Sequence, residues 1–116
     1  MMKIEVSKEL LIDYYNSLIG DIFKLMPLYE GLDILTKKVV YSSDEAYQQY
    51  RKYLIGFLNE LYGSYYMLDS IYLLKLFANL EGMLTIGLDE HDKLKSLVFK
   101  CIGIVNKLKE EMGNAT

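Results

Sequence analysis

The chain has 116 residues, a hydrophobic fraction of 52% and a net charge of −3 at pH 7. This length is enough for one domain with a single hydrophobic core, and this composition excludes a disordered chain. One Arg, one Cys and one His stand against eleven Tyr. These counts exclude an intramolecular disulfide and a site that holds dianions between several arginines.

The first predicted helix spans residues 8–26. Its apolar side chains recur at spacings of three and four residues, namely at Leu11, Tyr15, Leu18, Ile22 and Leu25. That spacing puts them on one face, which predicts an amphipathic helix. Pro27 has no backbone N–H, so we expect this helix to end or kink there.

Residues 28–40 carry the weakest pattern in the chain. Four apolar residues keep helical spacing there: Leu28, Leu32, Leu35 and Val39. Gly31 weakens a helix, and the run Val39-Val40-Tyr41 favours extended structure. We expect a short helix or helical turns, followed by a loop.

The second long helix is predicted at residues 43–62. Ser42 and Glu45 have the spacing of a capping box, in which the Ser42 side chain accepts a hydrogen bond from the Glu45 backbone N–H. An apolar stripe follows at Tyr47, Tyr50, Leu54, Phe57 and Leu61. Gly63 is a typical residue for ending a helix, so we expect a loop over residues 63–68.

Two further helices are predicted, from about residue 70 to Thr85 and from Asp89 to Gly113. Asp69 or Ser70 is the expected N-cap of the former, and Asp89 that of the latter. The latter carries a sustained stripe of Leu94, Val98, Cys101, Val105, Leu108 and Met112. These patterns together predict an all-α fold in one domain, residues 1–116. We expect an up-and-down antiparallel bundle of four long helices with an additional short helical segment near 28–40.

The only cluster of titratable groups is the run 89–92, Asp-Glu-His-Asp. Metal sites in helical bundles use ligands one helical turn apart, whereas these four residues are consecutive at a helix start, where negative charge is favourable. His91 invites comparison with histidine phosphotransfer domains, but Leu94 and Lys95 replace the Lys and Gly of their motif. We therefore predict no catalytic, cofactor-binding or metal-binding residue, and no cofactor.

The third helix is apolar around most of its circumference. A helix in a four-helix bundle buries only one stripe, so a second apolar set on this helix indicates an interface. The predicted interaction surface consists of Tyr72, Leu73, Leu76, Phe77 and Leu80. The competing set is Ile71, Leu74 and Met83. We expect a homodimer through this helix, unless residues 28–40 fold over the exposed set.

A secondary candidate surface lies on the last helix, where Lys93, Lys100 and Lys107 recur every seven residues. One interpretation is docking onto an acidic partner or a phosphate backbone. The other is a solvated helix face whose charge Glu110 and Glu111 balance. The abundant tyrosines allow two interpretations as well, namely packing at the core boundary or a protein interface.

The predicted function is a small non-enzymatic protein–protein interaction or regulatory protein. The coding bias towards Lys, Tyr and Ile suggests a low-GC bacterium or its phages or plasmids. Immunity proteins to bacteriocins are similar in size and four-helix architecture, and phage-encoded inhibitors of host defence belong to the same class. The alternative is a small-molecule-binding or enzymatic bundle that uses its interior. We expect a cytoplasmic protein that binds another protein, including its own copy, without nucleic acid or membrane insertion.

Overall fold

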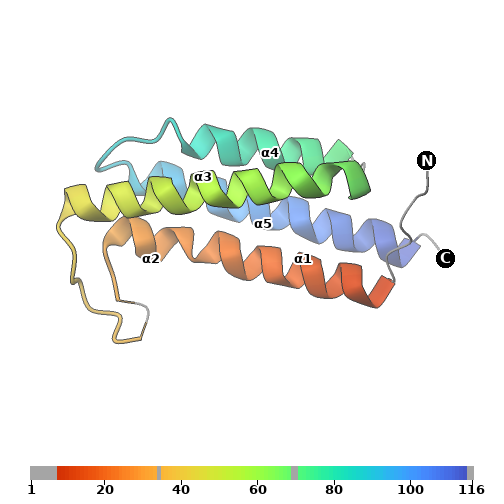
Figure 1. The fold of residues 1–116 in the computed structure, drawn as a ribbon, viewed down its shortest axis with the longest axis horizontal. Coiled ribbons are helices and arrows are strands. Elements are labelled where there is room, and N and C mark those ends of the chain that lie inside the picture. The colour runs from red at the N-terminus through yellow and green to blue at the C-terminus, as the bar shows by residue number, and fades with distance from the viewer. Residues whose placement is uncertain (1–7, 34, 69–70, 115–116) are drawn as a thin grey trace.

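The computed structural model describes residues 8–33, 35–68 and 71–114. These residues form the helices α1 (Lys8–Phe23), α2 (Leu25–Glu30), α3 (Ser43–Leu68), α4 (Ile71–Met83) and α5 (His91–Asn114). α1 and α2 make one bent arm, and the direction of the chain alternates between that arm, α3, α4 and α5 (Figure 1). The predicted all-α bundle of four long helical arms is confirmed.

The helices pack in a ring that is open at one seam. α5 lies between α4 and α1, and α3 packs against α2 and α4. In the described helices no Cα atom of α1 comes within 8 Å of a Cα atom of α3. The seam between α1 and α3 is therefore covered by side chains alone, and a surface groove lies along it.

The core is built from the apolar stripes that the sequence predicts. Every helix contributes fully buried side chains, including Ile22 of α1, Leu25 of α2, Tyr50 of α3, Leu80 of α4 and Val105 of α5. Cys101 belongs to this core as well, and burial raises the pKa of its thiol to about 12. A buried thiol with a raised pKa stays protonated, so Cys101 acts as a small apolar side chain.

The first arm bends at Lys24, one turn before the proline that the sequence marked. Lys24 lies between α1 and α2, and the chain is helical again from Leu25 to Glu30, through Pro27. Pro27 cannot donate to the carbonyl of Phe23, and its ring crowds that carbonyl, so the helix breaks four residues earlier. The predicted end or kink at Pro27 is corrected, because the interruption lies at Lys24, whose φ of −64° and ψ of −21° stay helical, and the helix continues through Pro27.

The short helical segment expected within 28–40 is shorter and starts earlier. α2 ends because Gly31 adopts the left-handed conformation, with φ of 75°. The Gly31 N–H donates to the Leu28 carbonyl, and the Leu32 N–H donates to the Pro27 carbonyl at 2.9 Å. These two bonds form a Schellman motif, which needs a residue without Cβ at Gly31. Among the described residues beyond it, 32–42 form a loop.

α3 starts where the sequence predicts and ends later. The Glu45 N–H donates to the Ser42 hydroxyl at 3.3 Å, which confirms that half of the capping box. The helix continues through Gly63 to Leu68, so the predicted stop at Gly63 is wrong. Glycine typically ends a helix where the chain turns left-handed, and Gly63 does not have the positive φ that Gly31 has.

The boundaries of α4 and α5 need two smaller corrections. α4 ends at Met83 and α5 begins at His91, two residues after the predicted cap Asp89. Asp89 has a φ of 63°, which is not the extended backbone of an N-cap residue. The predicted caps Asp69 and Ser70 lie outside the described residues.

The predicted interaction surface on α4 lies in the core of the monomer. Leu73, Leu76 and Leu80 are fully buried, Phe77 is buried, and Tyr72 is half-buried. α5 and α3 pack against α4, whereas no Cα atom of α2 comes within 8 Å of a Cα atom of α4. The prediction is therefore wrong, because the larger and more regular stripe on α4 was the one that faces the bundle. Of the competing set, Ile71 and Leu74 are exposed, whereas Met83 is buried.

The orientation of α4 can be tested with two leucines of the same helix. Leu76 has no exposed surface, whereas 45% of Leu74 is exposed. Leu76→Ala should lower the free energy of unfolding by about 2–5 kcal/mol, because it leaves a cavity in the core. Leu74→Ala should change it by no more than about 0.5 kcal/mol. Urea unfolding followed by circular dichroism measures both, and a larger loss for Leu74→Ala would contradict this orientation.

Candidate interaction surface

One end of the bundle is held together by side chains that donate hydrogen bonds to the main chain of residues 83–87. The bonds join Tyr50 to the Met83 carbonyl (2.8 Å), Arg51 to Leu84 (2.5 Å), Tyr47 to Ile86 (2.6 Å) and Tyr29 to Gly87 (2.6 Å). We call these four donors, Tyr29, Tyr47, Tyr50 and Arg51, the carbonyl clamp. Their bonds span 33 to 58 positions in the sequence.

The carbonyl clamp adds to the main-chain hydrogen bonds at the end of α4, where the N–H groups of residues 84–86 donate to the carbonyls of residues 81–83. The last carbonyl groups of a helix have no partner inside it, and buried carbonyls without partners are costly. The phenol of Tyr50 bonds to the carbonyl of Met83 inside the core, where both residues are fully buried. α2 and α3 thereby fix the path of the turn between α4 and α5.

The start of α5 joins the same network. The Glu90 N–H donates to the Tyr29 hydroxyl at 2.9 Å, and the Glu90 carboxylate accepts from the Gly87 N–H at 2.8 Å. The Lys93 ammonium also pairs with Glu90, and these partners lower the pKa of that carboxyl, Lys93 more than Gly87. His91 Nε2 lies 2.5 Å from Glu30 Oε1, which ties α5 to the end of α2.

The run 89–92 does not form a metal site in the described part of the chain. Within those residues no group of three or more His, Cys, Asp or Glu side chains is placed to hold an ion. Glu90 and His91 are instead occupied by Gly87, Lys93 and Glu30. The run therefore serves the start of α5, with Glu90 in the place predicted for Asp89.

The described residues between α2 and α3, 32–33 and 35–41, form a projecting loop that we call the apolar loop. It leaves the bundle at the end where α4 turns into α5 (Figure 1). The Asp33 carboxylate accepts hydrogen bonds from the Leu35 N–H at 3.2 Å and the Thr36 hydroxyl at 3.0 Å. Asp33 also exchanges main-chain bonds across the loop, donating to the Lys38 carbonyl at 2.9 Å and accepting from the Lys37 N–H at 2.7 Å.

The base of the apolar loop is as closely tied as its tip. The N–H groups of Val40 and Tyr41 both donate to the Gly31 carbonyl, at 2.9 and 3.3 Å. A Cβ atom at Gly31 would lie 3.0 Å from the Tyr41 carbonyl oxygen and 3.2 Å from the Ala46 Cβ. The loop is thus closed by hydrogen bonds at both ends, and Gly31 is needed for its close return to α3.

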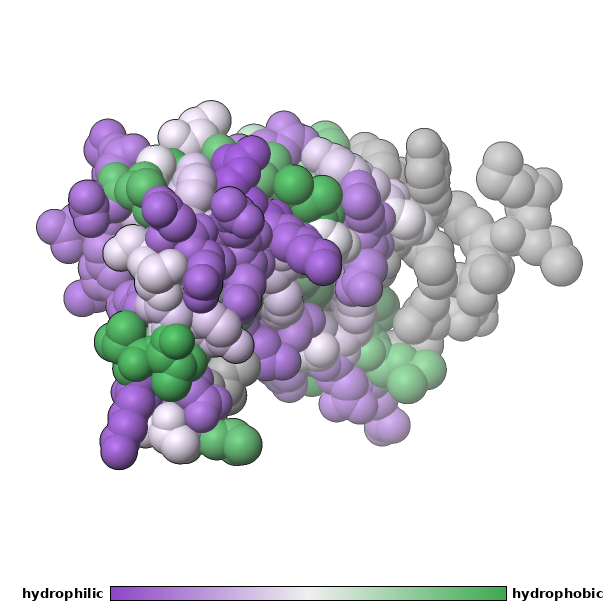
Figure 2. All heavy atoms as spheres, turned by 60° about the vertical axis from the view of Figure 1, so that its left-hand side comes forward, coloured by the Kyte–Doolittle hydropathy of each residue, from purple (hydrophilic) through white to green (hydrophobic). Residues whose placement is uncertain are grey.

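The apolar loop exposes its large side chains although its backbone is well bonded. Leu35 is 91% exposed and Val39 is 71% exposed, and Val40 and Tyr41 are exposed as well. Figure 2 shows green apolar atoms gathered on the projecting segment, with purple hydrophilic atoms beside them. Exposed apolar side chains on an ordered, protruding loop are typical of a binding surface.

A hollow of about 220 Å³ lies beside the base of the apolar loop, and we call it the end hollow. Its lining comes from the end of α2, the start of α3 and the turn into α5: Tyr29, Glu30, Ser43, Leu88, Asp89 and His91. The Tyr29 ring and the exposed Leu88 give it apolar surface, whereas Glu30 and Asp89 give it negative charge. The carbonyl clamp holds this lining in place through Tyr29.

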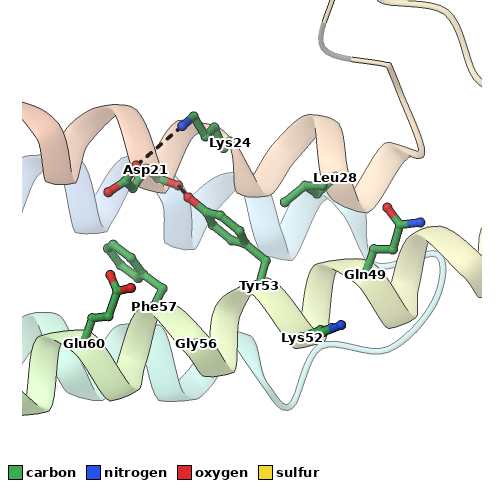
Figure 3. Close-up of a pocket in the computed structure, with 9 residues that line it drawn as sticks. All are labelled: Asp21, Lys24, Leu28, Gln49, Lys52, Tyr53, Gly56, Phe57 and Glu60. Carbon is green, nitrogen blue, oxygen red and sulfur yellow. Dashed lines mark hydrogen bonds and ion pairs between the residues drawn. The ribbon is translucent and has the colours of Figure 1, made fainter.

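The groove between α1 and α3 is larger, at about 590 Å³ (Figure 3). Tyr53 crosses it, donating to the Asp21 carbonyl at 3.2 Å, and its ring stacks on that of Phe57. Burial, and then the charges of Asp21 and Glu60, raise the pKa of Tyr53 to about 12. Lys24 pairs with Asp21 at 3.7 Å. The groove carries both signs of charge and is bridged across its width, so it does not single out one ligand.

The secondary candidate surface on α5 behaves as a solvated helix face. Lys93, Lys100 and Lys107 are all exposed. Lys93 pairs with Glu90, and Lys107 pairs with Glu110 at 3.2 Å, each three residues away along the chain. These local pairs match the second of the two interpretations offered by the sequence.

Sequence reasoning missed the apolar loop and the carbonyl clamp. The hydroxyl groups of the clamp tyrosines and of Tyr53 donate hydrogen bonds to main-chain carbonyls. For these tyrosines, the interpretation as packing at the core boundary is correct. The loop had a usable signal. Leu35 and the run 39–41 are apolar residues in a segment with poor helical character, beside Lys37 and Lys38. Apolar residues outside a regular element have few ways to reach the core, which favours exposure.

Comparisons of the chain with protein-family models, with curated proteins and with solved structures gave no match. Among the described helices, none is both long enough and apolar enough to cross a membrane. The inference of function therefore depends on the geometry of the surfaces described above.

The carbonyl clamp should make the protein sensitive to alkaline pH. Burial, with smaller contributions from Tyr47 and Tyr29, raises the pKa of Tyr50 above its ordinary value of 10.0. The unfolded chain therefore releases this proton at a lower pH than the folded chain does. The contribution of Tyr50 to the free energy of unfolding is thus fully present below about pH 10 and falls as pH rises further. Tyr50→Phe should lower the free energy of unfolding at pH 8 by about 0.5–1.5 kcal/mol, since the Met83 carbonyl loses the phenol and keeps only the Ile86 N–H at 3.3 Å. It should also reduce the loss of stability above pH 10.

Urea unfolding across this pH range measures both effects. The comparison is best made with Cys101→Ala as the reference and as the background of Tyr50→Phe, because the raised pKa of the Cys101 thiol acts in the same direction. Equal pH slopes for the two proteins would show that the Tyr50 phenol is not held protonated by the fold.

Proposed function

We propose that this chain is a non-enzymatic protein-interaction protein that binds its partners through the apolar loop. The observation that carries the proposal is the combination of order and exposure in the apolar loop. Asp33 and Gly31 fix the backbone of the loop, while Leu35 and Val39 project into solvent. A loop held in one conformation loses little conformational entropy when a partner covers it, which favours binding.

The contacts beneath the apolar loop support the proposal that this end of the bundle is the binding end. The carbonyl clamp and the Schellman motif at Gly31 form a rigid base beneath the loop. Binding loops on rigid scaffolds are the usual arrangement in proteins that recognise other proteins. A regulatory protein that acts by covering a partner's surface needs a binding surface of this kind and no catalytic site.

The alternative of a ligand in the bundle interior has no specific support. Converging tyrosine hydroxyls around a cavity would favour it. The largest fully buried side chain, Tyr50, instead donates its hydroxyl to Met83. Among the described residues, every buried side-chain nitrogen or oxygen has a hydrogen-bond partner. We therefore carry forward only the interaction role.

The proposal can be tested by photocrosslinking in the native host. A benzophenone amino acid in place of Leu35 should give discrete covalent adducts with protein, visible as bands of higher mass and identified by mass spectrometry. The same replacement at Leu10 is the matched control, because Leu10 is 62% exposed at the opposite end of the bundle (Figure 1). It should give none of these adducts.

A second substitution distinguishes specific docking from nonspecific association of exposed apolar side chains. Val39→Asp in the chain that carries the probe at position 35 should abolish the adducts, because it places a charge in the apolar surface. The proposal is wrong if position 35 yields no protein adduct, or if positions 35 and 10 yield the same ones.

A further inference from the structure

We propose that one partner of the apolar loop is a second copy of this chain. In this arrangement the loop of each copy docks into the end hollow of the other, around a twofold axis at this end of the bundle. The inference rests on the proposed function, since it names an occupant for the same loop. It replaces the α4 surface, which is buried, with a self-complementary surface.

The apolar loop and the end hollow lie next to each other, as a self-complementary surface requires. The apolar loop follows directly on Glu30 and Gly31, and Glu30 itself lines the end hollow. Loop and hollow are thus neighbours on one end of the molecule. A twofold axis through that end brings each loop over the other copy's hollow, so that two equal contacts form at once. The loop cannot fill its own hollow in this conformation, because it projects away from the bundle and leaves Leu35 exposed.

The hollow offers an apolar contact within a mixed lining. Leu35 and Val39 carry exposed apolar side chains, and Tyr29 and Leu88 supply the apolar part of a lining that also contains Glu30, Ser43, Asp89 and His91. An exposed leucine entering such a hollow removes apolar surface from water on both partners, which is the main favourable contribution to association.

Charge complementarity selects this occupant. The loop carries Lys37 and Lys38, both exposed, and no ion pair involves either of them within the described residues. The same end of the bundle carries exposed or partly exposed carboxylates at Glu30, Asp44, Glu45, Asp89 and Asp92. A basic loop tip in front of an acidic end fits a second copy of the same end, because opposite charges then meet in both contacts.

An anionic membrane surface fits this end less well than a second copy does. Lys37 and Lys38 would be attracted to it, but the surrounding carboxylates would be repelled, and the net charge of the chain is −3. Binding to anionic vesicles is therefore an outcome of the test and not the proposal.

The contact consists of two loops and two small hollows, so the expected dimer is weak. Small interfaces are typical of transient assemblies with dissociation constants in the micromolar range. Sedimentation equilibrium of the purified protein from about 1 µM to about 1 mM should therefore show the average mass rising from 13.5 kDa towards twice that value. Leu35→Asp should remove this rise, whereas Leu10→Asp should leave it unchanged.

A charge swap gives the decisive arm of the experiment. The loop variant is Lys37→Glu/Lys38→Glu. The hollow variant is Glu30→Lys/Asp92→Lys, in which Glu30 lines the hollow and Asp92 is an exposed carboxylate beside the lining residue His91. Each should raise the dissociation constant by at least about tenfold, because like charges then face each other. An equimolar mixture should restore association. In the mixed dimer both contacts are attractive, one with reversed and one with native charges.

The control variant Lys95→Glu/Lys100→Glu changes the net charge as much as the loop variant does, at exposed positions on α5. It should leave the dissociation constant unchanged. Circular dichroism confirms that each variant folds, and restoration in the mixture cannot come from misfolded chains.

Three results would overturn the inference. They are a wild-type protein that remains at 13.5 kDa throughout, a mixture that does not restore association, and a monomer that binds vesicles of anionic lipid but not of neutral lipid. The proposed function is judged separately. If the pure protein is monomeric while the probe at position 35 captures a different protein in cells, self-association is wrong and the interaction role stands.

Discussion

The hydrogen bonds from the carbonyl clamp to residues 83–87 are the interaction on which this end of the bundle depends. α4 is the shortest of the four arms and ends at Met83, which is fully buried. Phenol and guanidinium donors from α2 and α3 bond to the Met83 carbonyl and to three carbonyls of the turn that follows, those of Leu84, Ile86 and Gly87. Because each donor lies far from its acceptor in the sequence, the clamp also joins the two halves of the chain. The clamp thereby fixes the positions of the turn into α5, the end hollow and the base of the apolar loop.

The apolar loop keeps apolar side chains exposed to water while its backbone holds one conformation. Its backbone polar groups are bonded within the loop, through Asp33 at the tip and the Gly31 carbonyl at the base. Leu35, which is 91% exposed, therefore makes almost no contact that would hold the loop together, and its side chain remains available. A core residue contributes to stability by being buried, whereas Leu35 gains nothing from the monomer. This difference is the physical reason for assigning the loop to binding.

Tyrosine serves two purposes in this chain, and its phenol explains both. The ring fills space at the core boundary, while the hydroxyl reaches a carbonyl that an apolar residue would leave without a partner. Tyr29 does this twice, donating to Gly87 and accepting from Glu90. Tyr53 does it across the seam where no Cα atom of α1 comes within 8 Å of a Cα atom of α3. An abundance of tyrosine in a small bundle with open seams and short turns thus has a structural cause.

The sequence by itself determined the helices, because the spacing of Leu18, Leu54 or Val98 is a local property that any helix must satisfy. It also marked the start of α3 at Ser42 and the bend before α2, since capping and the missing proline N–H act within one turn. Only the tertiary structure decided which stripe of α4 faces the core and whether α3 continues past Gly63, because both depend on what α3, α4 and α5 place opposite each other. The surface that carries the proposed function belongs to the second group. Leu35 is apolar in the sequence, but its exposure follows from the way Gly31 and Asp33 turn the chain away from the bundle.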